Sequence, residues 1–248
     1  MHNQNTVEKM RQLRLHGMGR IHATHLTDNL YADYTIDQYT ALLTDTECEE
    51  RNNRKIERLF KTAGFRMAAS LNDVDYRANR GLDRNLFERL GQLNFISNKE
   101  NVIITGPTGS GKSYLAQALG NQACQMTLKT LYTNTSRIFS KLKLAKLDGS
   151  YLKELQKIER FDLLILDDFG LQAAFDNHAR EALMDIIEDR YNRSSTIVSS
   201  QIPVSKWHEI IGEGTIADAI LDRLIHSSHR ITLKGESMRK NQANKSNK

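Results

Sequence analysis

The stretch that decides the fold is NVIITGPTGSGKSYLAQ, residues Asn101–Gln117. An apolar run ends at a glycine, a loop with almost no side chains follows, and an amphipathic pattern begins at Lys112. The chain has 248 residues and 14 glycines, yet three glycines, Gly106, Gly109 and Gly111, fall within six positions. The segment GPTGSGKS matches G-x-x-x-x-G-K-[ST] between a predicted strand and a predicted helix, which is the context that this phosphate-binding motif requires.

Such a loop wraps a triphosphate in backbone N–H groups, and its glycines allow a close approach that a Cβ would obstruct. The helix that follows directs the positive end of its dipole at the anion. We expect Lys112 to reach the β- and γ-phosphates and Ser113 to ligate Mg²⁺. An ordinary glycine-rich turn is the alternative, but every defining position of the motif is present. The predicted nucleotide-binding residues are Gly106, Pro107, Thr108, Gly109, Ser110, Gly111, Lys112, Ser113 and Tyr114.

A second motif, FDLLILDDFG at Phe161–Gly170, places four consecutive apolar residues before two carboxylates. The apolar run suits a strand that is buried on both faces and ends at the ligand edge of a parallel sheet. We expect Asp167 to hold Mg²⁺ and Asp168 to polarise the attacking water. An acidic pair that caps a turn is the alternative. Asp168 stands where such sites usually have a glutamate, and its side chain is one methylene shorter.

Two further polar features have two interpretations each. Ser200 and Gln201 end the predicted strand in STIVSSQIP, where either one would orient the attacking water or simply form the turn that follows. Arg223 lies near the end of a predicted helix, Ile216–His226. It either completes the site of a neighbouring subunit or is a surface arginine favoured by the helix dipole. Spacing alone favours the surface arginine.

Alternating strand and helix patterns predict a parallel α/β sheet covered by helices on both faces. The strands are predicted at Val102–Thr105, Thr130–Thr133, Leu163–Leu166, Thr196–Ser199 and Arg230–Leu233. The intervening helices are predicted at Lys112–Met126, Ser136–Lys157, His178–Tyr191 and Ile216–His226. The predicted domains are a helical unit at 1–66, the α/β domain at 67–233 and a basic polar tail at 234–248.

The helical unit carries two segments that fit a capping box, TIDQ at Thr35–Gln38 and TDTE at Thr44–Glu47. Apolar residues recur at helical spacing from Thr6 to Leu30, and Gly64 is expected to end a later helix. This unit contains no catalytic motif. We therefore expect it to bind DNA or a partner.

Composition sets the class of protein. With 39% hydrophobic and 26% charged residues, the chain has the profile of a soluble globular protein. Its net charge of +5 favours a polyanionic partner without establishing one. Cys48 and Cys124 are isolated and too few for a disulfide framework, which indicates a reducing compartment. There is no signal-peptide pattern and no apolar run of about 18 residues, so we expect a cytoplasmic protein that does not span a membrane.

These motifs, in this order, resemble the AAA+ ATPases. The likeness is greatest to the IstB family, the helper ATPases of bacterial insertion sequences, and to the related DnaC-type helicase loaders. It covers nearly the whole chain, and STIVSSQIPVSKWHE and ADAILDRLIHSSHRITLKGESMRK resemble the IstB side in particular. The resemblance implies a five-stranded sheet of order 5-1-4-3-2, ATP and Mg²⁺ as cofactors, and a homo-oligomer with shared ATP sites that assembles on DNA.

The resemblance also assigns roles to residues by matching position. It makes Gly106, Gly111, Lys112 and Ser113 the Walker A residues, Asp167 and Asp168 the Walker B pair, Ser200 and Gln201 the sensor I candidates, Arg223 the arginine finger and Arg239 a candidate sensor II. Typical AAA+ proteins carry a helical lid after the last strand. Only about fifteen polar residues follow Leu233 here, so the resemblance implies no full lid, which agrees with the IstB and DnaC side.

The evidence for nucleic acid is less direct. Ser136–Lys157 follows the second predicted strand, where related initiators and loaders carry a helix that faces a nucleic-acid channel. Its lysines would contact phosphates independently of sequence or form a solvated face, and the arginines near the N-terminus would grip DNA or cover a helical core. The candidate DNA contacts are Lys141, Lys143, Lys146, Arg11, Arg14 and Arg20.

The function predicted from the sequence is an ATP-dependent, DNA-binding regulator of transposition. ATP would assemble it on duplex DNA, a transposase would be recruited, and hydrolysis would disassemble it. A helicase loader with the same motor is the alternative. A small-molecule P-loop kinase fits the glycine loop but not the acid pair or the Arg223 region. A scaffold with an inactive ATP site conflicts with the intact Lys112, Ser113 and Asp167.

Overall fold

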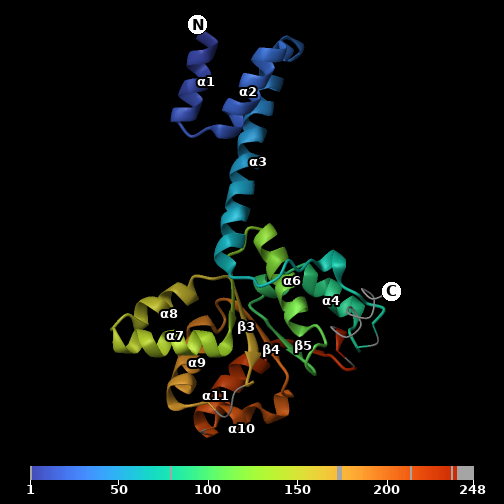
Figure 1. Cartoon of the computed structure of the whole chain (residues 1–248), viewed down its shortest axis with the longest axis vertical. Coiled ribbons are helices and arrows are strands. Elements are labelled where there is room, and N and C mark those ends of the chain that lie inside the picture. The colour runs from blue at the N-terminus through green and yellow to red at the C-terminus, as the bar shows by residue number, and fades with distance from the viewer. Residues whose placement is uncertain (1, 79, 172–174, 213, 236, 239–248) are drawn as a thin grey trace, which may run out of the picture. The chain divides into compact units, whose positions relative to one another are not determined.

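Figure 1 shows the computed structural model of the chain, which describes residues 2–78, 80–171, 175–212, 214–235 and 237–238. The chain packs into two compact units, residues 1–58 and 59–248. The last turn of the long helix α3 belongs to the second unit because Leu59 and Ala63 pack with Cys124. Packing thus divides the chain after residue 58. The division into functional domains after residue 66 stays a prediction.

The N-terminal unit is helical. It consists of α1 (His2–Gln12), α2 (His16–Asp28), the 3-10 helix η1 (Leu30–Asp33) and most of α3 (Ile36–Ala63). The backbone N–H of Thr35 donates to Gln38 Oε1 at 3.0 Å, and that of Gln38 donates to Thr35 Oγ1 at 3.3 Å, which confirms the first capping box. The second one is wrong. Thr44 lies inside α3, where its hydroxyl bonds to the Thr40 carbonyl at 3.0 Å because the helix continues through this segment.

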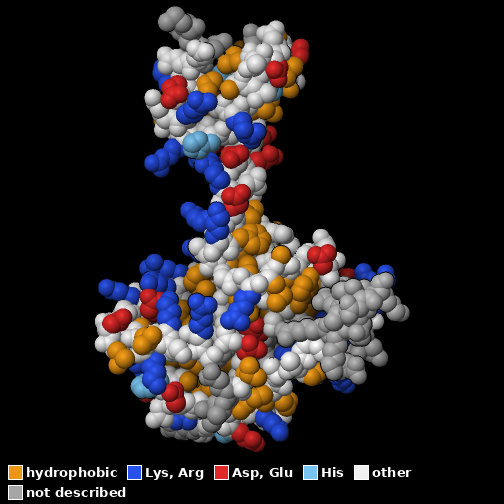
Figure 2. All heavy atoms as spheres, viewed as in Figure 1, with side chains coloured by type: hydrophobic (Ala, Val, Ile, Leu, Met, Phe, Trp, Pro, Cys, Tyr) orange, Lys and Arg blue, Asp and Glu red, His pale blue; other side chains and the backbone are white. Residues whose placement is uncertain are grey.

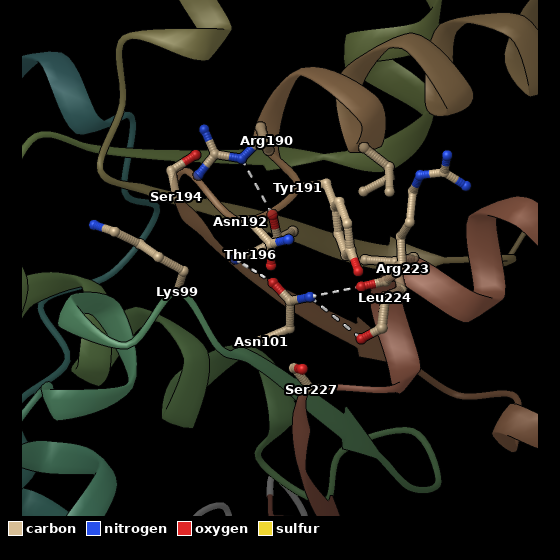
Figure 3. A pocket seen from close by; sticks show the side chains of 11 residues that line it. Lys99, Asn101, Arg190, Tyr191, Asn192, Ser194, Thr196, Arg223, Leu224 and Ser227 are labelled. Atoms are coloured by element: carbon tan, nitrogen blue, oxygen red, sulfur yellow. Dashed lines mark hydrogen bonds between the residues drawn. The ribbon is translucent and has the colours of Figure 1, made fainter.

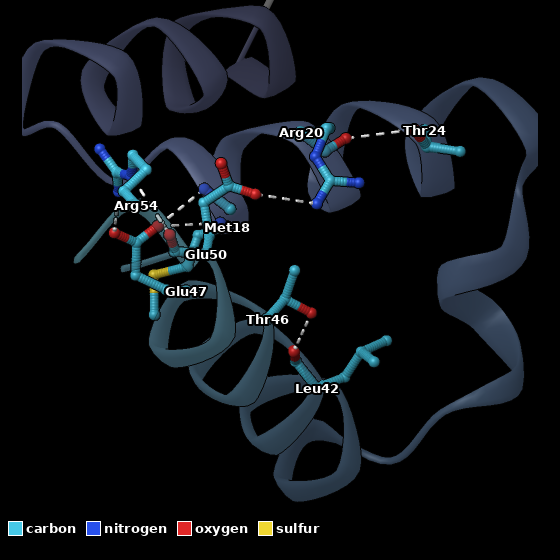
Figure 4. Close-up of polar contacts among 9 residues, drawn as sticks. Met18, Arg20, Thr24, Leu42, Thr46, Glu47, Glu50 and Arg54 are labelled. Carbon is cyan, nitrogen blue, oxygen red and sulfur yellow. Dashed lines mark hydrogen bonds and ion pairs between the residues drawn. The ribbon is translucent and has the colours of Figure 1, made fainter. Parts of the chain in front are cut away.

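A buried carboxylate joins α2 to α3 (Figure 4). Glu47 Oε2 accepts hydrogen bonds from the backbone N–H groups of Gly17 at 2.7 Å and Met18 at 3.3 Å, and Oε1 accepts one from Arg51 Nε at 2.7 Å. Burial raises the pKa of Glu47, but the hydrogen bonds from Arg51, Gly17 and Met18 outweigh it and hold the pKa below its usual value. A Cβ on Gly17 would lie 2.7 Å from the Thr46 carbonyl oxygen, so a glycine is needed where the helices touch.

The second unit is built on a five-stranded parallel sheet of order β2-β3-β4-β1-β5. Read from the other edge, this is the predicted order, so the fold prediction is confirmed. Each predicted strand is found within a few residues. The strands are β1 (Asn101–Thr105), β2 (Thr130–Asn134), β3 (Leu163–Phe169), β4 (Ser195–Ser200) and β5 (Ser228–Thr232).

Helices cover both faces of the sheet (Figure 1). On one face, α6 (Lys112–Gln125) packs Leu115, Leu119 and Ala123 against Val102, Ile104, Leu163 and Ile165, together with α4 (Arg84–Gly91) and α5 (Asn94–Ser97). On the other face lie α7 (Thr135–Leu147), α8 (Tyr151–Glu159), α9 (Asn177–Arg190), α10 (Trp207–Ile211) and α11 (Gly214–Ile225). Two 3-10 helices, η2 (Leu71–Asp73) and η3 (Val204–Lys206), complete the described elements.

The helix predicted at Ser136–Lys157 is wrong as a single element. It is divided into α7 and α8 because Gly149 adopts a positive φ of 75° and Asp148 forms a turn with Ser150. The end of α3 was predicted correctly: the helix ends at Ala63, and Gly64 has a φ of 75°. No helix among the described residues is long and apolar enough to cross a membrane.

Candidate nucleotide-binding site

The glycine loop connects β1 to α6, as predicted. A Cβ on Gly106 would lie 2.7 Å from the Leu233 carbonyl oxygen, because the loop begins directly beside the end of β5. Lys112 opens α6 with its side chain turned back over the loop, and its Nζ donates to the Pro107 carbonyl at 2.9 Å. The structure thus gives the loop, the lysine and the helix N-terminus the arrangement that an anion site needs.

A buried arginine that the sequence did not single out supports this loop. Arg80 is 4% exposed, and its Nη1 donates to the Ser110 carbonyl at 3.1 Å while Nη2 donates to the Asp75 carbonyl at 3.1 Å. A Cβ on Gly111, which has a φ of 95°, would lie 2.4 Å from Arg80 Nη1. The second motif glycine therefore makes room for Arg80 as well as for phosphate. No local pattern around Arg80 marks it, since the contact spans 30 residues.

Asp167 is buried near the end of β3, and its carboxylate accepts hydrogen bonds from hydroxyl groups on three elements. Ser113 Oγ of α6 donates to its Oδ1 at 3.0 Å, Tyr132 OH of β2 donates to its Oδ2 at 2.5 Å, and Ser199 Oγ of β4 donates to Oδ1. The structure therefore brings the two predicted metal residues together. No local pattern marks Tyr132 and Ser199 as site residues, although both lie in strands that were predicted to flank β3.

Asp168 adopts a left-handed backbone with a φ of 55°, which is unusual outside glycine. It lies where the register between β3 and β4 shifts, between Leu166 and Phe169. Asn134 Nδ2 donates to Asp168 Oδ2 at 2.8 Å, and Asn134 Oδ1 also caps α7. Burial and then the charge of Asp167 raise the pKa of Asp168, and the hydrogen bond from Asn134 opposes this rise. Asp168 also lines a hollow of about 300 Å³ that extends along α7 and the start of α9.

The structure distinguishes the two sensor I candidates. Ser200 is buried, and its hydroxyl donates to the Phe169 carbonyl at 2.7 Å and accepts from the Ile202 N–H at 3.0 Å. Gln201 Oε1 instead accepts a hydrogen bond from Thr108 Oγ1, in the glycine loop, at 2.5 Å. Gln201 therefore contacts the nucleotide loop, whereas Ser200 ties β4 to β3.

Arg223 lies near Asn101, at the amino end of β1 (Figure 3). The side-chain amide of Asn101, the first residue of β1, donates to the carbonyls of Arg223 and Leu224, both at 3.3 Å. The loop begins at the other end of β1, about 13 Å along the strand. Arg223 Nη2 pairs with Glu188 Oε2 at 2.8 Å, and its guanidinium lies over the Tyr191 ring. The adjoining cavity of about 10 Å³ holds no more than one water.

The remaining predicted site residues are less central. Tyr114 OH donates to the Ser70 carbonyl and accepts from the Ser70 N–H, both at 3.3 Å, so its hydroxyl is turned toward the chain before the sheet. Arg239 lies outside the described residues. The candidate nucleotide contacts that the structure assembles are therefore those of the loop and of Lys112 and Ser113.

The candidate DNA-binding residues are mostly ion-paired. Figure 2 shows Lys and Arg side chains interleaved with Asp and Glu on the visible face of both units. In the second unit the pairs are Lys141–Glu154, Lys143–Asp176 and Lys146–Glu181; in the N-terminal unit they are Arg11–Glu8 and Arg20–Glu50. Arg14 is exposed in the turn between α1 and α2, with a φ of 60°. Each of these pairs has at least one exposed partner, and such pairs are weak, so they do not prevent phosphate contacts.

The model of the IstB-like ATP binding protein family matches residues 8–246, nearly the whole chain. The chain belongs to this family. Among its IstB-like relatives, the insertion-sequence ATP-binding protein y4pL of Sinorhizobium fredii is 44% identical over 241 residues, which cover 97% of this chain and 98% of that protein. An insertion-sequence ATP-binding protein of Pseudomonas fluorescens is 40% identical over 206 residues, 83% of this chain and 89% of that protein.

Solved structures agree with the fold of this IstB-like protein. The crystal structure of DnaI has a TM-score of 0.56 at 23% identity and covers 66% of this chain and 90% of its own. AMPPCP-bound DnaA from Aquifex aeolicus has a TM-score of 0.56 at 17% identity and covers 72% of this chain and 55% of its own. At these identities the likeness concerns the fold alone. The family and the relatives establish an ATP-binding AAA+ ATPase associated with insertion sequences.

Proposed function

We propose that this ATPase is a DNA-binding regulator of transposition, which assembles on duplex DNA when it binds ATP, recruits or activates a transposase, and disassembles on hydrolysis. The names of the relatives support the link to insertion sequences. A net charge of +5 and the exposed basic residues of both units support a polyanionic partner that is bound without regard to sequence. A DnaC-type helicase loader remains the second candidate, because such loaders share the motor.

The site's residues fit Mg²⁺, which would screen the phosphate charge. Ser113, at the start of α6, and Asp167, in β3, offer hard oxygen ligands 3.0 Å apart. Among the described residues no group of three His, Cys, Asp or Glu side chains is placed to hold a metal. The ion would therefore depend on phosphate oxygens and water for its other ligands, as Mg²⁺ usually does. Lys112 would bind the β- and γ-phosphates, and Asp168 would orient the attacking water.

The position of Arg223 carries the proposal of a shared site. This arginine cannot reach its own glycine loop, because the length of β1 separates them and Glu188 and Tyr191 hold it at the amino edge of the sheet. On release from Glu188 it would enter the site of a neighbouring copy, where it would neutralise charge on the transferred phosphoryl group. Where such arginines act, they contribute roughly 10³–10⁵ in rate. ATP would then join subunits, and its hydrolysis would release them.

Four proteins test the proposal: the wild type and the Lys112→Ala, Asp168→Asn and Arg223→Ala variants. ATPase rate and oligomer size are measured with ATP or a non-hydrolysable analogue, each with and without duplex DNA. We expect Lys112→Ala to lose ATP-dependent assembly, Asp168→Asn to stay assembled, and Arg223→Ala to bind nucleotide but lose turnover.

Mixing subunits tests the shared site directly. Lys112→Ala subunits keep Arg223, and Arg223→Ala subunits keep the loop, so a mixture should recover part of the activity that each lacks alone. Arg193→Ala is the matched control, because Arg193 is an exposed arginine paired with Glu159 at 3.2 Å. Wild-type hydrolysis by pure Arg223→Ala would refute the shared site. Pull-down of a hexameric helicase instead of a transposase would favour the loader.

A further inference from the structure

Tyr132 is a buried hydroxyl donor to Asp167. It lies on β2, is 4% exposed, and its phenol donates to Asp167 Oδ2 at 2.5 Å. Ser113 and Ser199 both bond to the other oxygen, Oδ1. The backbone N–H of Asp168 also donates to Oδ1, at 3.1 Å. The phenol thus holds Oδ2 while these groups hold Oδ1, and together they fix the rotation of the carboxylate. A hydrogen bond to an ionised carboxylate is among the stronger ones, and in a buried position it is not exchanged readily for water.

The ring of Tyr132 packs against the segment that leaves α3. The Phe65 ring lies 6.4 Å from the Tyr132 ring, centroid to centroid, and the Arg66 guanidinium lies 5.9 Å above it. Phe65 is itself seated in a close-fitting place: a Cβ on Gly120 of α6 would lie 2.8 Å from the Phe65 ring. A displacement of Phe65 or Arg66 would therefore shift the Tyr132 ring, whose hydroxyl donates to the Asp167 carboxylate.

A second connection joins the same segment to Ser113. The backbone N–H groups of Arg66 and Met67 donate to Gln117 Oε1 at 2.7 and 3.3 Å. Gln117 is fully buried, and its Nε2 donates to the Ser113 carbonyl at 3.1 Å. The residues that follow α3 therefore contact, through one intermediate side chain each, both residues that offer oxygens to the cation.

We propose that Tyr132 is a positioning residue that orients Asp167 for Mg²⁺, and that Phe65 and Arg66 set the position of its ring. The inference rests on the proposed role of Asp167 as a metal residue. It also predicts an effect of the segment after α3, Phe65 and Arg66. Displacement of this segment should weaken Mg²⁺-dependent binding of the nucleotide, although every residue of the phosphate loop is still present. Groups that orient a metal ligand typically contribute roughly 10–100-fold in metal affinity.

Tyr151 provides a matched control within the same unit. Its hydroxyl donates to Asp185 Oδ2 at 2.5 Å, and the Lys146 ammonium lies 4.9 Å above its ring, so it reproduces the tyrosine, the carboxylate and the cation. Tyr132→Phe and Tyr151→Phe thus each remove one phenol–carboxylate hydrogen bond. They differ in whether that carboxylate belongs to the ATP site.

The test measures binding of a fluorescent, non-hydrolysable ATP analogue to the full chain, once with excess Mg²⁺ and once with EDTA. The ratio of the two dissociation constants reports the contribution of the metal, without turnover. We expect Tyr132→Phe to reduce this ratio roughly 10-fold with little change in EDTA, and Tyr151→Phe to leave it unchanged. A wild-type ratio for Tyr132→Phe, or an equal loss in Mg²⁺ and EDTA, overturns the inference.

Asp167→Asn separates this inference from the proposed function. If Asp167→Asn lowers the ratio of dissociation constants and Tyr132→Phe leaves it at the wild-type value, the metal role of Asp167 stands and the positioning role of Tyr132 fails. If Asp167→Asn also leaves the ratio unchanged, both roles fail. Phe65→Leu tests the segment itself. Phe65→Leu alone should reduce the ratio of dissociation constants at least about twofold. In a protein that already carries Tyr132→Phe, it should cause no further reduction, because the effects of contacting residues are coupled. If the effects of Phe65→Leu and Tyr132→Phe add in the double variant, Phe65 does not act through Tyr132.

Discussion

Arg223 Nη2 and Glu188 Oε2 form an ion pair of 2.8 Å that holds the arginine against its own subunit. The two residues belong to α11 and α9, and the Tyr191 ring lies under the guanidinium 5.7 Å away. Half of the Glu188 side chain is exposed, so the pair opens to solvent at low cost. The proposed role of Arg223 in a neighbouring site requires it to leave this position, so we expect Glu188 to influence turnover.

Glu188→Gln removes the charge that holds Arg223 and keeps the shape of the side chain. We expect ATP turnover of the DNA-bound assembly to rise by up to about fivefold, because an exposed pair contributes about 0.2–1 kcal/mol. Steady-state ATPase assays over a range of protein concentrations measure it. Glu159→Gln is the control, since it disrupts the exposed pair with Arg193. A fall in turnover would show instead that Glu188 orients Arg223 productively.

Gln201→Ala and Ser200→Ala should separate a kinetic role from a structural one. Gln201 contacts Thr108 of the phosphate loop, so we expect its loss to lower kcat about 10²-fold with little change in melting temperature. Ser200→Ala leaves the Ile202 N–H and the Phe169 carbonyl without their hydroxyl partner and should cost about 1–3 kcal/mol of stability. ATPase assays and thermal melts check both. Equal kinetic losses in the two variants would contradict the distinction.

The phosphate loop and the parallel strands were predictable because their causes are local, whereas the order of the strands followed from the family resemblance. A loop that wraps phosphate needs glycines at fixed offsets, and buried parallel strands need continuous apolar runs such as the one before Asp167. Tyr132, Ser199 and Arg80 were not predictable in the same way. Each acts through a contact with a residue at least 30 positions away, which depends on strand register and helix placement.

Local signals also misled where tertiary structure decided the outcome. TDTE has the letters of a capping box, but its Glu47 bonds to the backbone of α2 and the helix continues. The lysines of Ser136–Lys157 form no uniform basic face, because four of them pair with acids on α8, at the N-cap of α9 and on α9 itself. Neither outcome can be seen from spacing within one segment.

Glu47→Gln should destabilise the N-terminal unit at neutral pH. The folded pKa of Glu47 lies below its ordinary value of 4.5, so its stabilising contribution is present above about pH 4.5 and is lost as the pH falls through the folded value. We expect about 1–3 kcal/mol less protection of the Gly17 and Met18 amides at pH 7. Hydrogen exchange on the full chain measures it. The difference from wild type should shrink in acid, and the exposed Glu49→Gln should show none.

Arg80→Met tests whether the buried arginine holds the phosphate loop open for nucleotide. Methionine fills part of the volume but cannot donate to the Ser110 carbonyl, so the loop loses the contact that fixes its last turn. Hydrogen bonds from charged groups contribute about 1.5–3 kcal/mol, which corresponds to roughly 10–100-fold weaker binding of an ATP analogue in EDTA. Arg80→Lys should restore part of it. Arg84→Met, which removes an exposed pair with Glu88, is the control. Unchanged affinity in Arg80→Met would mean that the glycine loop holds its conformation without this arginine.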